Sequence, residues 1–225
     1  MVETGEENCG AEAIKAKSAE STKRAILRAA LEEFALKSVS GARAREISAK
    51  AGVNHAAINY HFGGKNEMYE EILRAAVDSF RAEISEFLAE ADAFLKSPVR
   101  DKSAAIEMIK KAFLRTHNRL SSENFMRLML LLKREEIFPS RSFDITFEGS
   151  FKPSMEALVS LILVLKEGAS RQSAIMTAFT LIGLNDSVCS CRTAYLRLSG
   201  KSEIDESDIA MFGGIVSEQI ERILS

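Results

Sequence analysis

The sequence predicts an all-α protein, and three observations support this prediction. The 225-residue chain contains only 12 glycines and 3 prolines, which are the residues that punctuate turn-rich sheets. Ala, Leu, Ile, Glu, Lys and Arg are plentiful, a composition that favours helices. Apolar residues recur at spacings of three and four along much of the chain. With 46% hydrophobic residues, the chain can bury a sizeable core, either as one domain or as a small domain followed by a larger one.

Charge is unevenly distributed, although the formal net charge is only −2. Residues 1–14 hold four acids and no Lys or Arg, whereas residues 15–65 hold ten Lys or Arg against four acids. The second segment therefore carries +6, and a short basic segment of this kind is typical of a contact with nucleic acid. The polar, acidic residues 1–17 lack periodicity and are predicted to form a flexible tail, with folded structure starting near Ser18 to Ser21.

The first helix after the tail is predicted from the apolar face that Ile26, Ala30 and Phe34 form. Small residues from Ser38 to Ala42 end it. A long amphipathic helix is predicted from Lys65 through about Glu90, and its length suits a connector between domains. Further helices are expected near 103–120, 123–137, 154–168, 170–190 and 205–224, with breaks at Pro98, at Pro139 to Gly149 and at Ser199-Gly200.

Two short helices lie between the first helix and the connector, and together they predict a helix-turn-helix. One runs from Ala44 to a turn at Gly52, and Asn54 is a suitable N-cap for the other, over 55–61. Ser48 is small where the two helices cross and Gly52 opens the tight turn, and we expect larger side chains at either position to prevent the packing of the two helices. In such motifs the second helix presents side chains to the major groove of DNA.

The outer face of this second helix carries side chains that suit contact with DNA. Asn59 can hydrogen-bond a base edge, Tyr60 and His61 can donate to phosphates, and Ala56 can touch a thymine methyl group. Lys65 adds a cation at a helix N-terminus, where backbone N–H groups favour a phosphate. The predicted contacts, including two arginines expected to reach the flanking DNA backbone, are Arg43, Arg45, His55, Ala56, Asn59, Tyr60, His61 and Lys65.

The run from Thr22 to Leu73, with REISAKAGVNHAAINYHFGGKNEMYEEIL at its centre, resembles the TetR family of transcriptional regulators. The resemblance covers roughly the first third of the chain. It implies that Asn54 to Phe62 is the recognition helix and that Lys65 holds a phosphate. It also implies a helical C-terminal domain that dimerises through its last two helices and binds an inducer in an internal cavity. Ser38 replaces a common glycine and Asn59 a frequent aromatic residue, so the preferred half-site can differ from that of better-known members.

Two apolar stripes near the C-terminus predict a dimer interface. They lie in the helices expected near 170–190 and 205–224, and two such helices from each chain can form a four-helix interface. The alternative is that both stripes belong to the core of a single chain. The residues expected in the interface are Ile175, Phe179, Ile182, Gly183, Ile209, Phe212, Gly213, Val216 and Ile220.

A cavity for an effector is expected among aromatic and methionine side chains, because such walls adapt to an apolar ligand. The simpler interpretation is that these residues are ordinary core, and that the histidine among them is a core or surface residue rather than a ligand contact. The candidate lining residues are Phe113, His117, Phe125, Met126, Met129 and Phe179.

No catalytic, metal or cofactor site is predicted. The three histidines and three cysteines form no triad and no metal-ligand spacing. Cys189 and Cys191 point to different sides of a helix, and with Cys9 they are interpreted as idle thiols of a reduced, cytoplasmic protein. The sequence shows neither a signal peptide nor the run of roughly 20 apolar residues that crosses a bilayer, so no membrane partner is expected.

The predicted function is a ligand-responsive repressor that binds a palindromic operator as a homodimer. Its expected partners are double-stranded DNA, a second copy of the chain, and a small, largely apolar effector. The expected domains are the tail (1–17), a helix-turn-helix DNA-binding domain (18–65), and a helical effector-binding and dimerisation domain (66–225). An all-α enzyme and a helical interaction scaffold are the alternatives, and neither explains the concentration of positive charge in residues 15–65. The sequence does not distinguish a repressor from an activator.

Overall fold

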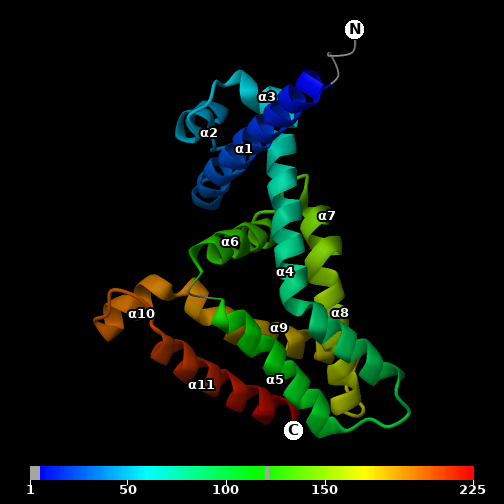
Figure 1. The fold of residues 1–225 in the computed structure, drawn as a ribbon. Coiled ribbons are helices and arrows are strands. Elements are labelled where there is room, and N and C mark those ends of the chain that lie inside the picture. The colour runs from blue at the N-terminus through cyan, green and yellow to red at the C-terminus, as the bar shows by residue number, and fades with distance from the viewer. Residues whose placement is uncertain (1–5, 120–121) are drawn as a thin grey trace.

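The structure is a computed structural model that describes residues 6–119 and 122–225, with side chains described outside residues 6–18, 117, 118, 188 and 189. Within those ranges the secondary structure is helical and no strand occurs. The all-α prediction is therefore confirmed. Figure 1 shows a small head at the N-terminal end, a long helix that runs out of it, and a larger helical body.

The head consists of α1 (Glu6–Leu36), α2 (Ala44–Ala51) and α3 (Ala56–Phe62). The centre of its core is formed by side chains that are at most 1% exposed, namely Ile26, Phe34, Ile47 and Ile58. Because α1 begins at Glu6, the prediction of a loose tail is wrong for residues 6–17. This stretch is rich in Ala, Glu and Lys, which favour helices.

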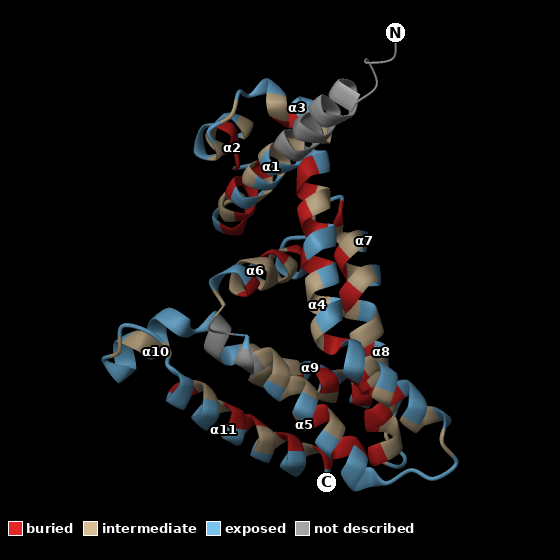
Figure 2. Cartoon of the chain, in the orientation of Figure 1, coloured by how far each residue is buried: buried red, intermediate tan, exposed pale blue. Residues whose placement is uncertain are grey.

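The connector is α4 (Lys65–Lys96), which ends beyond the predicted limit near Glu90. Its first turns pack into the core of the head through Met68 and Leu73. Its later turns pack into the core of the body through Phe87 and Ala91. Figure 2 shows buried residues along α4 both beside the head and within the body. A tilt of this helix therefore moves the head relative to the body.

The body lies around α8, which packs against α4, α5 and α9. Its helices lie near the predicted positions, and one short helix before the last was not predicted. In chain order the larger elements are α5 (Lys102–Asn118), α6 (Glu123–Ile137), α8 (Lys152–Leu165), α9 (Arg171–Ser190), α10 (Arg192–Ser199) and α11 (Glu206–Leu224).

The predicted break at Pro139 to Gly149 is helical in its second half. There α7 (Phe143–Thr146) continues through a π-helical turn, η1 (Phe147–Phe151), into α8. Gly149 lies on this turn, and a Cβ there would stand 2.7 Å from Cγ1 of Val77 on α4. The glycine that suggested a loop instead allows a helix to approach α4 closely.

Helices α9 and α10 meet at a bend of 50°. Among the described residues no single helix is long and apolar enough to cross a membrane, and the pair α9–α10 meets the length and composition requirement only when both helices are taken together. Part of the apolar surface of α9 is covered inside the body, where Ala174, Ala178 and Leu181 are fully buried.

Candidate functional site

The turn between α2 and α3 has the geometry of the predicted helix-turn-helix. Gly52 ends α2 with φ +68°, a left-handed conformation that side chains disfavour. A Cβ at Gly52 would have no atom within 4 Å, so the expectation of a steric clash at this position is wrong and the glycine is required for its φ. Ser48 is 4% exposed, and its Oγ donates to the Arg45 carbonyl at 3.1 Å, as expected for a small residue at the crossing.

Helix α3 is oriented with one face in the core and the other toward solvent. The Asn54 Oδ1 atom accepts a hydrogen bond at 2.9 Å from the N–H of Ala56, the first residue of α3. Asn54 was predicted as the N-cap, but this position is taken by His55, whose side chain forms no cap hydrogen bond. Ile58 is 1% exposed, whereas Tyr60 is 82% exposed. Such an exposed polar and aromatic face can enter a major groove. The side chains exposed on or beside α3 are His55, Ala56, Asn59 and Tyr60, whereas His61 is half-buried.

Much of the positive charge of the head is already paired. Lys37 forms salt bridges with Glu33 and Glu46, at 2.8 and 2.7 Å, and the hydrogen bond from Lys37 lowers the pKa of Glu46. By contrast, Arg43 and Arg45 at the start of α2 are exposed. Neither forms a salt bridge with any residue that the structure describes, so both guanidinium groups can meet phosphates.

Lys65 lies at the first position of α4, as predicted, but it also has partners inside the head. Its side chain is half-buried, and its Nζ donates to the carbonyl oxygens of Val39 and Ala42, at 2.6 and 3.0 Å. Two of its three N–H groups are therefore used inside the head. The lysine ties the start of α4 to the α1–α2 connection, so its direct contribution is to position the head.

Helix α6 is anchored to the head on one side. Leu131 is fully buried in the core of the head, and Nη1 of Arg134 donates to the Phe34 carbonyl at the end of α1 at 2.9 Å. Glu135 is 1% exposed, and Oε1 accepts a 2.5 Å hydrogen bond from the Tyr69 hydroxyl on α4. Burial and this bond to the carboxylate raise the pKa of Tyr69, so the phenol stays protonated and remains the donor.

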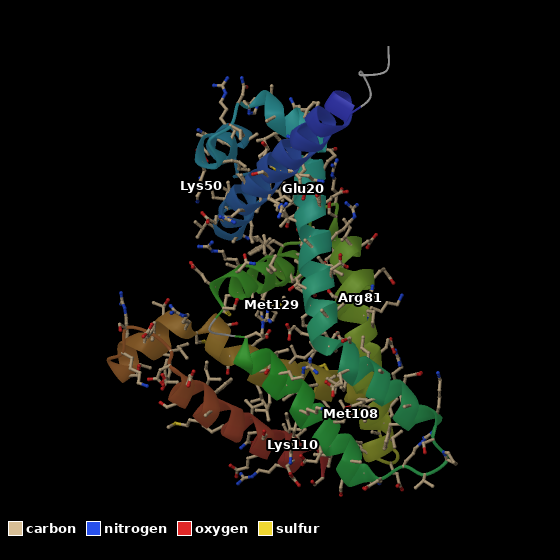
Figure 3. All side chains as sticks on the ribbon, viewed as in Figure 1. Glu20, Lys50, Arg81, Met108, Lys110 and Met129 are labelled. Carbon is tan, nitrogen blue, oxygen red and sulfur yellow. The ribbon has the colours of Figure 1, made fainter. Side chains whose placement is uncertain are left out.

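The opposite side of α6 borders a cavity of about 720 Å³. The cavity lies among α4, α5, α6, α8 and α9 and reaches the start of α10. Figure 3 shows Met129 on the side of α6 that faces away from the head. Because residues spaced by three or four lie on one helix face, the same face carries the other cavity residues of this helix. The main lining residues from α6 are Met126, Met129, Leu130, Lys133 and Glu136.

Only some of the residues predicted to line the effector cavity do so in the structure. Phe125, Met126 and Met129 line the cavity. Phe113 packs against the body core and does not line the cavity. Phe179 is 48% exposed and does not line the cavity. The side chain of His117 lies outside the described residues.

Sequence patterns missed the polar part of the cavity wall. Lys133 and Glu136 come from α6, Thr116 from α5, and Asn185 and Asp186 from α9. These residues are dispersed along the chain and no motif links them. They come together only when three helices pack, so no local signal in the sequence points to them.

The residues predicted for the dimer interface lie in different environments in the structure. Val216 and Ile220 are at most 2% exposed in the body core of the same chain. A Cβ at Gly213 would stand 2.7 Å from Cδ2 of Leu114 on α5. These three residues face α5 rather than a partner, so their prediction as interface residues is wrong. Ile175, Ile182 and Phe212 pack partly against the same core, and Ile209 lines a smaller hollow of about 330 Å³ beside α10.

Several other residues of α9 and α11 are exposed, together with Phe179 and Gly183 of the predicted interface. Gly183 of α9 is exposed, and a Cβ there would meet no atom within 4 Å. Exposed apolar surface on two neighbouring helices is typical of an interaction site. The large exposed side chains are Met176 (63%), Phe179 (48%), Met211 (69%) and Ile215 (53%).

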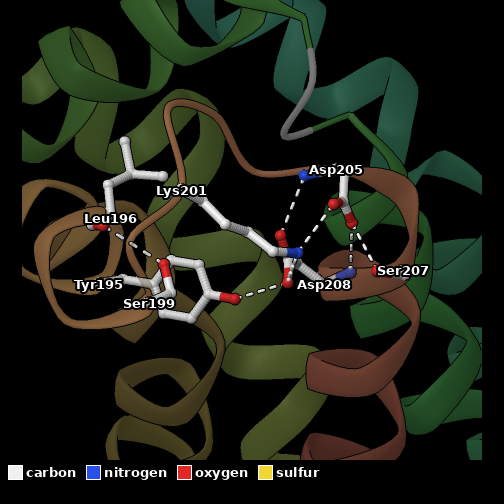
Figure 4. Close-up of polar contacts among 7 residues, drawn as sticks. All are labelled: Tyr195, Leu196, Ser199, Lys201, Asp205, Ser207 and Asp208. Atoms are coloured by element: carbon white, nitrogen blue, oxygen red, sulfur yellow. Dashed lines mark hydrogen bonds and ion pairs between the residues drawn. The ribbon is translucent and has the colours of Figure 1, made fainter.

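A polar cluster fixes the start of α11. Asp205 and Asp208 form a capping box, and Lys201 donates to both carboxylates, at 2.7 and 2.6 Å. The Tyr195 hydroxyl on α10 donates to Asp208 at 2.6 Å (Figure 4). The bonds from Lys201 lower the pKa of both aspartates. The cluster therefore holds α10 against the first turn of α11.

Within the described residues, no group of three or more His, Cys, Asp or Glu side chains could hold a metal ion. Cys191 is a free, exposed thiol. The side chains of Cys9 and Cys189 lie outside the described residues, so the structure leaves the interpretation of all three as idle thiols a prediction.

Two family models match the chain in succession. Residues 26–72 match the model of the bacterial regulatory proteins of the tetR family, which covers α2, α3 and the adjoining parts of α1 and α4. Residues 103–225, more than half of the chain, match the C-terminal domain of the HTH-type transcriptional dual regulator CecR. The chain belongs to the TetR family. Membership confirms the predicted class of transcription regulator, and it argues against the enzyme and scaffold alternatives.

Individual TetR-family relatives agree with this assignment. The chain is 29% identical over 143 residues to CecR of Shigella flexneri, and the match covers 64% of each chain, a little under two thirds of that relative. AibR, solved with isovaleryl coenzyme A and operator DNA, has a TM-score of 0.64 at 13% identity, covering 88% of this chain and 97% of AibR. NalD of Pseudomonas aeruginosa, a secondary repressor of a multidrug efflux pump, has a TM-score of 0.59 at 21% identity, covering 91% and 97%. These structural likenesses show a shared fold.

Proposed function

We propose that this TetR-family chain is a ligand-responsive repressor, which binds a palindromic operator as a homodimer in the cytoplasm. The observation that carries the proposal is the position of α6, which bonds to the head on one side and lines a cavity on the other. A molecule in that cavity therefore touches an element that also holds the DNA-binding head.

The proposed DNA contacts rest on the exposed face of α3 and on the two arginines that form no salt bridge with a described residue. Asn59 and Tyr60 face outward to meet base edges and backbone, while Arg43 and Arg45 flank them at the start of α2. Two such heads in a dimer must be separated by roughly 34–36 Å to meet successive major grooves on one side of DNA. The operator is then a palindrome, because the two heads are related by a twofold axis.

The dimer is proposed through the outward faces of α9 and α11. The four exposed apolar side chains Met176, Phe179, Met211 and Ile215 supply the apolar contact, and the open position at Gly183 allows the partner helix to approach closely. Removing this surface from water by pairing two copies is favourable. Only Phe179 and Gly183 of the predicted interface belong to this outward face.

Release of DNA requires an effector that binds the released conformation better than the DNA-bound one. Ligand in the cavity would push on α6 and α4, which share the core of the head through Leu131 and Met68. The two heads would then leave the operator spacing. AibR, whose structure contains both an acyl-coenzyme A and operator DNA, supports the pairing of a ligand and DNA in one such fold. Aromatic and methionine side chains in the wall support a ligand with a largely apolar body.

The experiment is a selection of operator DNA from a random pool by the full chain, followed by titration of the selected duplex at two salt concentrations. Arg45→Ala is compared with Arg81→Ala, since both arginines are exposed and neither forms a salt bridge with a described residue. Arg81 lies on α4 below the head (Figure 3). Tight, salt-sensitive binding that only Arg45→Ala weakens supports the proposal. Failure to select any sequence would refute it.

The name of CecR, a dual regulator, makes activation the second candidate. A reporter gene carrying the selected operator upstream or across its promoter distinguishes the two modes. Repression predicts higher expression when the regulator is deleted, and activation predicts lower expression.

A further inference from the structure

The cavity combines an apolar wall with polar side chains that carry no charge. Phe125, Met126 and Met129 of the apolar wall come from α6, and Phe151 comes from η1. At about 720 Å³, the cavity has the size that holds a small organic molecule. The class of ligand depends on what the polar groups still offer. The uncharged polar side chains from α5, α7, η1, α8 and the inner part of α9 are Thr116, Thr146, Ser150, Ser154 and Asn185.

The charged side chains at the cavity balance one another. The described lining residues include three acids and three bases. Arg127 forms a salt bridge with Glu123 at 2.6 Å, and Lys133 forms one with Asp186 that joins α6 to α9. Breaking either pair to admit an ionic ligand would leave one charge without its partner.

The other two charged residues are Glu136 and Arg192, which are opposite in sign. Both are exposed, and neither forms a salt bridge with a described residue. Exposed charges are solvated and attract an ion only weakly. An ionic head group that entered the cavity would therefore lose its hydration without gaining a buried counter-ion. Neither a cationic nor an anionic ligand is favoured.

The hydroxyl protons along α7, η1 and α8 are already used. The Thr146 hydroxyl donates to the Phe143 carbonyl, and the Ser150 hydroxyl donates to the Thr146 carbonyl, both at 2.8 Å. The Ser154 hydroxyl lies 2.9 Å from the carbonyls of Ser150 and Phe151. Each hydroxyl oxygen still offers lone pairs. A ligand donor adds a hydrogen bond there without breaking one, whereas a ligand acceptor requires a hydroxyl to leave its carbonyl.

Asn185 adds an acceptor that has no donor. The Thr116 hydroxyl donates to the Phe113 carbonyl at 2.7 Å, so its oxygen accepts from Nδ2 of Asn185 at 3.2 Å. This bond fixes the orientation of the amide. The Oδ1 atom is buried without a partner among the described residues, which is destabilising. A ligand that widens the cavity, as the proposed release of DNA requires, can bring an O–H or N–H group to this oxygen.

We infer that the cavity takes an uncharged amphipathic molecule that presents hydrogen-bond donors, as an alcohol, a phenol or an amide N–H does. Its apolar body packs on the Phe and Met wall, and its donors bond to Asn185 and to the hydroxyl oxygens. This inference rests on the proposed ligand-responsive function and names the class of its effector.

The test uses four probes that share one apolar body: 4-(2-naphthyl)butanol, its methyl ether, and the corresponding amine and carboxylate. Each is titrated into the full chain without DNA. Because the chain contains no tryptophan, the emission of the naphthyl group reports binding over a weak protein background. The alcohol is expected to bind about tenfold or more tightly than each of the other three.

Three variants test the groups that set this order. Asn185→Leu should weaken the alcohol about tenfold and leave the ether unchanged, because only the alcohol donates. Lys133→Met leaves Asp186 unpaired and should strengthen the amine alone, whereas Asp186→Asn leaves Lys133 unpaired and should strengthen the carboxylate alone. Ser187→Ala is the control, because its hydroxyl donates to the Leu184 carbonyl on α9 outside this cavity, and it should preserve the order.

The order of the four probes on the wild-type chain decides the inference even where a variant fails to fold. Equal binding of the alcohol and the ether, tighter binding of either ion, or no detectable binding of the alcohol would overturn it. An alcohol preference that survives Asn185→Leu in a folded protein would also overturn it, as would affinities for the two ions that neither charge variant changes.

Operator titrations in the presence of the same probes separate this inference from the proposed function. If the amine or the carboxylate releases operator DNA and the alcohol does not, the inference fails while the ligand-responsive function stands. If the wild-type chain binds no operator, the proposed function fails, and the fluorescence titrations still decide which head group the cavity prefers.

Discussion

The hydroxyl of Tyr69 on α4 donates a 2.5 Å hydrogen bond to Oε1 of Glu135 on α6. The same ring packs edge-on against Phe34 of α1, with ring centroids 4.9 Å apart. The second oxygen of the Glu135 carboxylate accepts from the N–H and hydroxyl of Ser140. One buried phenol therefore joins the head, the connector and the helix that borders the cavity.

Removing the Tyr69 hydroxyl should destabilise the fold. Tyr69→Phe leaves the buried Glu135 carboxylate without one donor, and hydrogen bonds to charged groups contribute about 2 kcal/mol. We expect the free energy of unfolding in urea to fall by about this amount. Tyr60→Phe is the control, since Tyr60 is 82% exposed and should not change stability. Equal stability of both variants and wild type would show that the bond contributes nothing.

Lys65→Ala should weaken operator binding without changing its salt dependence. Removing a side chain that neutralises one phosphate lowers the salt slope by about 0.9, but Lys65 bonds to the carbonyls of Val39 and Ala42 and is predicted to act by holding the head. Arg45→Ala should lower both the affinity and the slope. The measurement is operator affinity over a range of salt concentrations. A slope change for Lys65→Ala as large as that for Arg45→Ala would assign the lysine to a phosphate after all.

Ile215→Asp should convert the dimer into monomers. Ile215 is 53% exposed on α11, and a charge buried without a partner at an apolar interface strongly opposes association. Val99→Asp, at a residue 77% exposed in the loop between α4 and α5, is the control. Sedimentation of both variants measures the mass. A dimer that persists in Ile215→Asp at the concentrations used for wild type would place the interface elsewhere.

The contribution of the Lys201 cluster to stability should disappear in acid. Asp205 and Asp208 have a lowered pKa in the folded protein. Their contribution is therefore fully present above the ordinary aspartate pKa of about 3.9 and is lost as the pH falls through the lower folded value. The stability difference between wild type and Lys201→Met should thus be largest above about pH 5 and shrink below about pH 4.

Urea unfolding across that pH range measures the difference. Lys96→Met is the matched control, because it removes one exposed salt bridge with Asp92 and should give a small difference at every pH. A Lys201→Met difference that stays constant into strong acid would show that the two aspartates do not depend on Lys201.

Local signals predicted the head well. The turn at Gly52 and the inward Ile58 follow from short-range chemistry, and the structure has both. Asn54 also bonds to the start of α3, from one position before the N-cap. Gly52 provides the predicted tight turn through its φ of +68°, whereas the additional expectation of a steric limit at this position is wrong, because a Cβ there would meet no atom within 4 Å. Periodicity could not place Lys65, because its partners are carbonyls more than 20 residues earlier in the chain.

Periodicity was a weaker guide in the body. Helices α9 and α11 carry apolar residues on inner and outer faces, so a stripe such as Val216 and Ile220 could lie in a core or at an interface. The structure places these two against α5 and leaves Met211 and Ile215 exposed. Gly149 was predicted as part of a break because glycine is common in loops, and the need for glycine beside Val77 appears only when α4 is present.

The central claim is that the cavity and the DNA-binding head are coupled through α6, and Met129→Trp tests it most directly. The larger side chain fills part of the cavity that Met129 lines, so it imitates a bound effector without requiring its identity. We predict that operator affinity, measured by titration, falls about tenfold in this variant and is unchanged in Val99→Trp. Operator affinity equal to that of wild type in a folded, dimeric Met129→Trp protein would contradict the coupling.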